Sequence, residues 1–288
     1  MESTLTPVAH RVPVRDIELA VREWPGDERP FLLVHGLASN ALTWEGCGPV
    51  LSTAGHRTVA IDQRGHGRSD KPETGYGFED VTADLRALIE SLGLERPVIA
   101  GQSWGGNVVL EFAARYPDVA SGIVLVDGGF IDLSSRPGAT WETTEQVMRP
   151  PNLLGIPRRQ LADRFRSFHA NWDDGQIEMQ MGNYETLEDG TIRPWLTLDR
   201  HMQILRALWE QRPVELAARV TVPVLIALAD QPDEERRARR DAETERLMAG
   251  LKRAEVKEFA GAPHDIHVDR PKALSEWMLD ALQCGFFG

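Results

Sequence analysis

Cysteine, long apolar runs and positive charge are all scarce in this chain, and each scarcity excludes a class of protein. The 288 residues include two cysteines, Cys47 and Cys284, which is too few for a disulfide scaffold and lacks metal-type spacing. We therefore expect reduced thiols and a cytoplasmic location. No window approaches the roughly 18 continuous apolar residues of a membrane span. The first residues, MESTLTPVAHRVPVRD, have no apolar stretch after a basic start, so we expect no secretory signal peptide.

The charge balance is acidic. Lys and Arg number 32 against 44 Asp and Glu, which gives a formal net charge of -12 and a pI near 5.2. A phosphate backbone or an anionic membrane surface would be repelled on average, so neither nucleic acid nor a membrane is an expected partner. The hydrophobic share of 42% is ample for a buried core, and the length suits one or two domains.

The chain does contain a regular alternation of short apolar runs and helical patterns. The runs cover residues 31–34, 58–61, 98–100, 122–126, 222–228 and 256–259. Each is rich in Val, Ile and Leu and bounded by Gly, Pro or Asp, which predicts strands buried on both faces of a largely parallel sheet. Residues 12–24 predict a leading strand pair that turns near Arg15 and Asp16. Apolar periodicity predicts helices over 81–92, ended by Gly93, and over 271–282.

The alternation stops between residues 133 and 212. Pro and Gly cluster over 149–157, and aromatic residues accumulate: Trp141, Phe165, Phe168, Trp172, Trp195 and Trp209. We interpret this segment as a mostly helical insertion over one edge of the sheet; a few ordinary sheet-flanking helices are the alternative. Most of these aromatic side chains are expected to form the insertion's own core.

The strongest chemical signal is the sequence Gly101-x-Ser103-x-Gly105, which lies between an apolar run and a helical pattern. A serine on a sharp turn from strand to helix adopts strained backbone angles, and small neighbours let the two elements approach each other. Such a turn raises the hydroxyl above the sheet edge and directs a helix N-terminus at the reacting carbon. The pattern predicts that Ser103 is a nucleophile.

At these residues the chain resembles the α/β-hydrolase superfamily, in the branch of small bacterial esterases, lactonases and related hydrolases. Three further motifs carry the resemblance: His35-Gly36-Leu37, the turn from Asp62 to Ser69, and the segment from Pro263 to Pro271. The resemblance implies a mostly parallel eight-stranded sheet flanked by helices. It also implies a core of residues 1–132 and 213–288, with a helical cap of residues 133–212. It implies neither a metal nor an organic cofactor, and the chain is expected to be a monomer or a homodimer.

The base that activates Ser103 is expected to be a histidine. His264 follows the last predicted strand and precedes the last helix, which is where the superfamily's order of Ser, acid and His places it. His267 is the alternative, and a His264-x-x-His267 metal pair is a further one. In the family's pattern His35 and His66 have structural roles.

The acid of the triad is open among three aspartates. Asp127 lies 24 positions after Ser103 and follows the predicted sixth strand, as in some branches of the superfamily. Asp233 and Asp230 follow the next strand, but their spacing departs from the family's G-x-x-D pattern, and either could instead cap a helix. Asp127 is preferred, with Asp233 as the first alternative.

The family's motif assigns the oxyanion hole to the backbone N–H groups of Leu37 and Trp104. With this machinery we expect an acyl-enzyme mechanism acting on a small-molecule ester or lactone with a substantial apolar part. A proline-iminopeptidase-like peptidase, a carbon–carbon bond hydrolase and a hydrolase-like binding protein are the alternatives. Epoxide hydrolases and haloalkane dehalogenases are disfavoured because they need Asp where Ser103 stands. A peptidase would need acidic side chains in the insertion; Glu178, Glu185 and Glu188 are present but match no recognised motif.

Overall fold

A mostly parallel eight-stranded sheet forms the centre of the molecule, as predicted. The computed structural model describes residues 5–288. The strands are β1 (Val8–Val14), β2 (Ile17–Trp24), β3 (Glu28–Val34), β4 (His56–Ile61), β5 (Val98–Gln102), β6 (Gly122–Val126), β9 (Val224–Ala229) and β10 (Ala254–Phe259). Their order across the sheet is β1-β2-β4-β3-β5-β6-β9-β10. The strands from β4 to β10 pair in parallel, whereas β1 and β2 form an antiparallel hairpin that joins the sheet through β4.

The burial of the strands follows their place in the sheet. The central strands β5, β6 and β9 are buried at every position, as their continuous apolar sequences predict. Residues 256–259 were expected to be buried on both faces, and this expectation was wrong: β10 is an edge strand with exposed positions. The predicted turn near Arg15 is present, and Arg15 has a positive φ of 51°.

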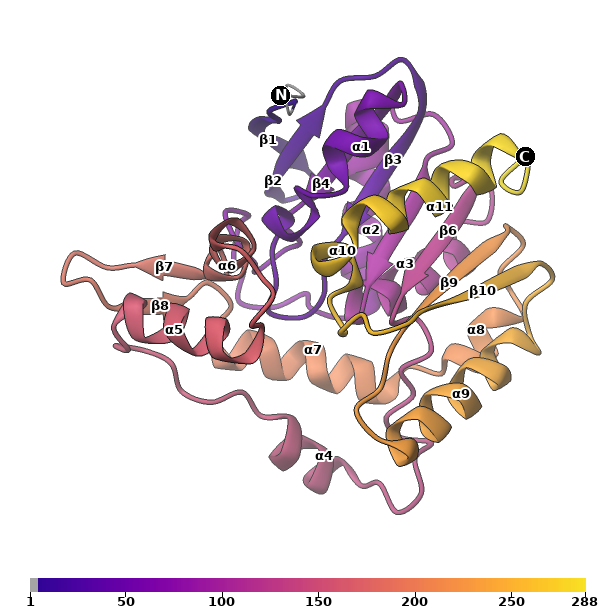
Figure 1. Ribbon diagram of the computed structural model, residues 1–288. Helices are drawn as coiled ribbons and strands as arrows, with labels where there is room; N and C mark the ends of the chain where they lie inside the picture. The colour runs from indigo at the N-terminus through magenta and orange to yellow at the C-terminus, as the bar shows by residue number, and fades with distance from the viewer. Residues whose placement is uncertain (1–4) are drawn as a thin grey trace.

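Helices cover both faces of the sheet (Figure 1). On one face lie α1 (Gly48–Thr53) and α11 (Pro271–Gln283), which bury Leu51 and Leu274. On the other lie α2 (Phe78–Leu92), α3 (Trp104–Arg115), α8 (Pro213–Ala217) and α9 (Glu234–Met248). Among residues 5–288, no helix has the length and apolar character needed to cross a bilayer.

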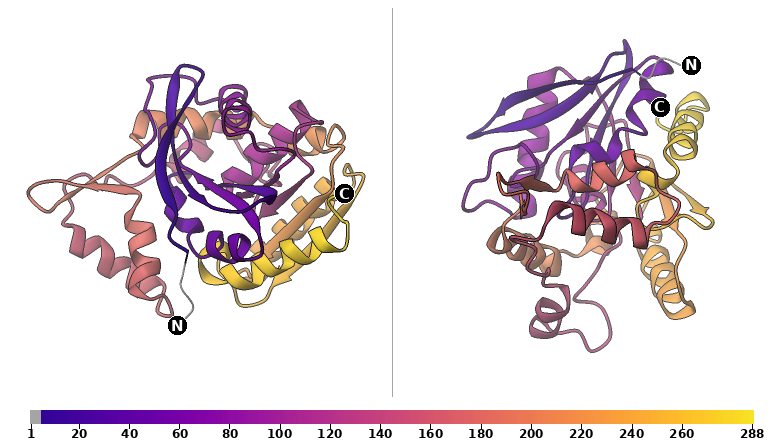
Figure 2. Two further views of the ribbon diagram at one scale, coloured as in Figure 1. Left: turned by 90° about the horizontal axis from the view of Figure 1, so that it is seen from above. Right: turned by 60° about the vertical axis from the view of Figure 1, so that its left-hand side comes forward.

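Residues 133–212 connect β6 to β9 and lie at one end of the sheet (Figure 2). They form α4 (Trp141–Met148), α5 (Arg158–Phe168), α6 (Asp174–Met181), β7 (Tyr184–Thr186), β8 (Ile192–Pro194) and α7 (Leu198–Glu210). The small β7–β8 hairpin was not predicted. An apolar cluster separate from those of the sheet joins this segment, through Trp172 and Ile177, to Val268 near the end of the chain. The division of the chain into a core and a cap at these boundaries stays a prediction.

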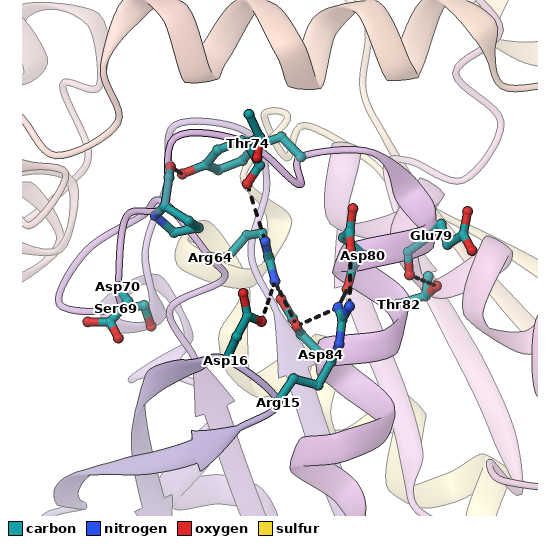
Figure 3. A network of polar contacts seen from close by, with 12 residues as sticks. Arg15, Asp16, Arg64, Ser69, Asp70, Thr74, Glu79, Asp80, Thr82 and Asp84 are labelled. Carbon is teal, nitrogen blue, oxygen red and sulfur yellow. Dashed lines mark hydrogen bonds and ion pairs between the residues drawn. The ribbon is translucent and has the colours of Figure 1, made fainter.

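A buried ion pair fixes the turn that follows β4. Arg64 donates from Nε and Nη2 to the two carboxylate oxygens of Asp84 in α2, at 2.6 and 3.0 Å, and both side chains are 3% exposed. Arg15 adds a contact of 3.1 Å to the same carboxylate (Figure 3). Two parallel N–H···O bonds give a specific orientation. The network therefore ties the segment from Asp62 to Ser69 to helix α2.

Candidate active site

Ser103 stands at the turn between β5 and α3. Its backbone angles, φ 53° and ψ −123°, lie in a region that few residues other than glycine adopt. The adjacent glycines permit this turn: a Cβ on Gly101 would lie 2.2 Å from the carbonyl oxygen of Gly105, and one on Gly105 would lie 2.4 Å from that of His35. The Ser103 N–H donates to the carbonyl of Val126, the last residue of β6. The hydroxyl group is thus held at the carboxyl edge of the sheet.

His264 and Asp127 are brought together at the same edge. The Nδ1 atom of His264 lies 2.6 Å from Oδ2 of Asp127. The other carboxylate oxygen of Asp127 accepts a hydrogen bond of 3.1 Å from the N–H of Ala229 at the end of β9. Asp127 is buried, whereas 53% of the His264 side chain is exposed. A fixed carboxylate therefore orients a ring whose second nitrogen remains available.

The environment of His264 favours its protonated form. The surrounding protein desolvates the ring and by itself would lower the pKa. The hydrogen bond and the negative charge of Asp127, together with the charge of Asp265, outweigh this effect and raise the pKa of His264 above its ordinary value. Such an environment would stabilise an imidazolium, which a histidine acting as a general base must form.

Asp233 and Asp230 are engaged elsewhere. Asp233 is the N-cap of α9, and its side chain accepts a hydrogen bond of 2.8 Å from the N–H of Arg236. Asp230 accepts hydrogen bonds from the N–H groups of Gln231 and Gly261 and pairs with Arg237. The structure joins neither of them to His264 and assigns that contact to Asp127.

The chain segments of Ser103 and His264 are neighbours. The side chain of Gln102 donates to the carbonyl oxygen of His264 at 3.4 Å and to Oδ1 of Asp265 at 3.3 Å. Between residues 5 and 288, however, no hydrogen bond joins the Ser103 hydroxyl to the His264 ring. Catalytic hydrogen bonds are often long before substrate binds and tighten in the complex. Neither Gln102 nor Asp265 was singled out by the sequence, because no motif marks the residue beside a nucleophile or a base.

The N–H groups of Leu37 and Trp104 have no acceptor within residues 5–288. Trp104 is the first residue of α3, so its N–H is one of the donors that a helix start leaves unused. Leu37 lies in the loop after β3, beside Ala38, whose positive φ of 58° bends the loop. Both groups are therefore available to an oxyanion at the positions that the motif predicts.

Two buried histidines hold the Leu37 loop. The Nε2 atom of His35 accepts from the N–H of Gln63, and that of His66 accepts from the N–H of Ala38. In each ring Nδ1 faces a backbone carbonyl oxygen, so Nδ1 carries the proton and the ring is neutral. Burial lowers the pKa of His35 to about 4 and that of His66 well below its ordinary value. This neutral state is required by the contacts themselves.

His267, the alternative base, points into the protein interior. It is fully buried, packs against the ring of Trp44 at 4.5 Å between centroids, and burial lowers its pKa to about 3. No group of three or more His, Cys, Asp or Glu side chains able to hold a metal occurs in the part of the chain that the structure describes. Burial also raises the pKa of the Cys47 thiol to about 12, which suits an inert structural cysteine.

The comparison with protein families identifies the family of the chain. A family described as "alpha/beta hydrolase fold" matches residues 29–271, and the chain belongs to this family. Among curated proteins, the 2-(acetamidomethylene)succinate hydrolase of Mesorhizobium japonicum is 38% identical over 228 residues, which cover 76% of each chain. The non-heme chloroperoxidase of Streptomyces lividans is 28% identical over 274 residues, covering 90% of this chain and 93% of that protein.

A solved structure is similar over almost the whole chain. The crystal structure of E-2-(acetamidomethylene)succinate hydrolase has a TM-score of 0.76 and 27% sequence identity, and the match covers 96% of this chain and 99% of the other. The predicted fold and superfamily are therefore confirmed.

Proposed function

We propose that this protein is a serine hydrolase that cleaves a carboxylic ester or a lactone through an acyl-enzyme intermediate. The carrying observation is the 2.6 Å contact between His264 and Asp127 beside the strained turn of Ser103. An isolated serine motif has many explanations. A buried carboxylate that is hydrogen-bonded to the imidazole after the last strand adds a base and a group that orients the base. Together with the serine these make a nucleophile–base–orienter arrangement.

The reaction has two halves in this proposal. Ser103 Oγ attacks the carbonyl carbon while Nε2 of His264 accepts the hydroxyl proton, and the oxyanion is bound by the N–H groups of Leu37 and Trp104. Collapse of the tetrahedral intermediate breaks the bond to the leaving alkoxide, which takes the proton from His264. Water, deprotonated by His264, then attacks the acyl-enzyme, and collapse of the second tetrahedral intermediate releases the acid while His264 returns the proton to Ser103 Oγ. Asp127 keeps the Nδ1 proton of His264 in place and stabilises the imidazolium.

A second candidate is hydrolysis of an acylated amine that carries carboxylate groups. The observation that favours it is the 38% identity to a protein named 2-(acetamidomethylene)succinate hydrolase, over three quarters of the chain. The same nucleophile, base and oxyanion donors would serve an amide, with His264 protonating the leaving nitrogen.

The structure gives less support to a peptidase. Such an enzyme would need free acidic side chains to bind a substrate ammonium group. Glu178 pairs with Arg158, and Glu185 pairs with Arg193. Glu188 is exposed.

The experiment is covalent labelling followed by a substrate panel. A fluorophosphonate probe should label Ser103 in the native protein, as located by mass spectrometry of the labelled peptide, and should fail to label the Ser103→Ala variant. The panel compares p-nitrophenyl esters, lactones, N-acetyl enamides of dicarboxylic acids and aminoacyl anilides. Absence of labelling at Ser103 would overturn the serine mechanism, whereas turnover of the enamides alone would replace the ester proposal with the second candidate.

A further inference from the structure

Helix α6 and its flanking residues contact both loops of the candidate active site. One loop carries Leu37 and continues into η1 (Ala41–Trp44); the other carries His264 and continues into α10 (Ile266–Asp269). These loops belong to opposite ends of the sequence, and each needs a fixed position relative to Ser103. Contacts that α6 makes with both of them therefore bear on catalysis.

The first set of contacts joins α6 to the His264 loop. The Gln176 side chain donates to the carbonyl oxygen of Val268 at 2.7 Å, and the Trp172 indole donates to Oδ1 of Asp269 at 3.2 Å. Val268 is 2% exposed and packs in one apolar cluster with Trp172 and Ile177. The loop that follows His264 is thus bonded to, and packed against, the segment between β6 and β9.

The second set joins the end of α6 to the Leu37 loop. Asn40, three residues after Leu37, donates from Nδ2 to the carbonyl oxygen of Met179 at 2.9 Å and to Oδ1 of Asn183. Its own Oδ1 accepts from the N–H of Leu42 at 2.8 Å, as the cap of η1. Because Asn40 is 2% exposed, water does not compete freely for these hydrogen bonds.

A third contact closes the arrangement. Trp44 of η1 packs against His267 of α10, so the two loops also touch each other in the interior. The three elements η1, α10 and α6 therefore form a closed triangle. A displacement of α6 must either move both loops or break the partly buried hydrogen bonds of Gln176 and Asn40.

We infer that α6 sets the position of the His264 loop relative to the Leu37 loop, with Gln176 and Asn40 as its positioning residues. This inference rests on the proposed function. It deepens that proposal because a substrate that displaces α6 would alter the placement of the base and of one oxyanion donor. Misplacement of catalytic groups by about 1 Å can cost up to 10²-fold in rate.

Neutral substitutions at the two sets of contacts between α6 and these loops test the inference. Gln176→Met keeps the length of the side chain and removes the hydrogen bond to Val268. It also removes half of a capping box, because Oε1 of Gln176 accepts from the N–H of Asp173. Asp173→Ala is the matched control, since it disrupts the same capping box through the other residue and leaves the bond to Val268. At the other end, Asn40→Ser keeps an N-cap hydroxyl for Leu42 and withdraws the donor from Met179.

The expected result separates the variants from the control. Gln176→Met and Asn40→Ser should lower kcat by on the order of tenfold, with KM changed by less than about twofold. Asp173→Ala should keep the kcat of the wild type. In Gln176→Met an NMR titration should also give a lower His264 pKa than in the wild type, because the loop loosens its bond to Asp127. The carboxylates that face His264, Asp127 and Asp265, are unchanged in all three variants.

Two outcomes would overturn the inference. One is an unchanged kcat and an unchanged His264 pKa in folded Gln176→Met and Asn40→Ser. The other is an equal loss in Asp173→Ala, which would mean that only the stability of α6 matters. Thermal unfolding establishes that each variant is folded, and Trp172→Phe replaces Gln176→Met if that variant is not. A failure of the proposed function is distinguishable, because the wild type itself would then leave Ser103 unlabelled while the NMR comparison remained informative.

Discussion

His264 and Asp127 share a hydrogen bond of 2.6 Å although 137 residues separate them in the sequence. The sheet makes this contact possible, because β6 and β9 are neighbours and the loop after β10 returns across the carboxyl ends of both. The N–H of Ala229 holds the free oxygen of Asp127, so the carboxylate cannot turn away from the ring without losing a buried hydrogen bond.

The first prediction concerns the nucleophile and the base. Ser103→Ala and His264→Ala should each lower kcat by on the order of 10³-fold or more, and the double variant should lose little more than either single one, because the two residues act as a unit. Steady-state hydrolysis of the best ester in the panel measures this. Losses that multiply in the double variant would show that the two side chains work independently.

The second prediction separates the three aspartates. Asp127→Asn should lower kcat by on the order of 10²- to 10⁴-fold, because an amide cannot stabilise the imidazolium or hold the correct tautomer. Asp233→Asn and Asp230→Asn serve as controls of the same chemical change, and both should stay within about threefold of the wild type, since these residues cap α9 and bind the 261 loop. A large loss in either control would move the triad acid away from Asp127.

The third prediction is the pH dependence of turnover. The proposed mechanism needs neutral His264, whose pKa is raised, so kcat/KM should rise with pH along a limb whose midpoint lies above the ordinary histidine value of about 6.5. In Asp127→Asn the residual activity should show this limb at lower pH, because the neutral amide no longer favours the imidazolium. If the midpoint of the limb were the same in the wild type and in Asp127→Asn, the limb would not report the titration of His264 beside Asp127.

The fourth prediction is acid destabilisation by buried histidines. Burial lowers the pKa of His35 and of His201 to about 4. Between that pH and about 6.5 these two histidines are therefore protonated in the unfolded chain and neutral in the folded protein. The free energy of unfolding should therefore fall as pH drops through this window, by up to about 1.4 kcal/mol per pH unit for each such histidine. Urea unfolding at a series of pH values measures the slope.

His264 contributes to the pH dependence of the free energy of unfolding with the opposite sign. Because its folded pKa is raised, the stability that it adds is fully present below the unfolded value and is lost as pH rises through the folded value. In a His35→Gln variant the free energy of unfolding should fall less steeply with decreasing pH than in the wild type. The variant lacks one of the histidines that are protonated only in the unfolded chain. An unaltered slope would mean that His35 is not neutral in the folded protein.

Much of the fold could be predicted because its signals are local. Gly122–Val126 is apolar throughout and bounded by turn residues, and β6 has these same ends. Residues 81–92 carry one apolar face, and α2 ends at Leu92 with Gly93 in a left-handed conformation, as the glycine predicts. The start of α2 at Phe78 was missed. Its N-cap is Gly77, which has no side chain to form the capping hydrogen bond that marks many helix starts in a sequence.

The acid of the proposed triad could not be predicted in this way. Asp127 and Asp233 both follow strands, and both have side chains that accept backbone N–H groups. Which of them meets His264 depends on how the 260–265 loop crosses the sheet edge, and this path is set by tertiary packing. The contacts of Gln176 and Asn40 were missed for the same reason: each side chain also serves a local cap, and its second hydrogen bond joins segments that are distant in sequence.

Helix α4 has no buried residue, and the stretch from 150 to 155 after it is largely exposed. Backbone of this kind tolerates added chain, because few packing contacts are lost when it is interrupted. A fluorescent reporter or an affinity peptide spliced in near Pro151, which is exposed, would precede Leu153 and Ile156, which pack against the cluster of Trp172 and Val268, and would leave the triangle of η1, α10 and α6 intact.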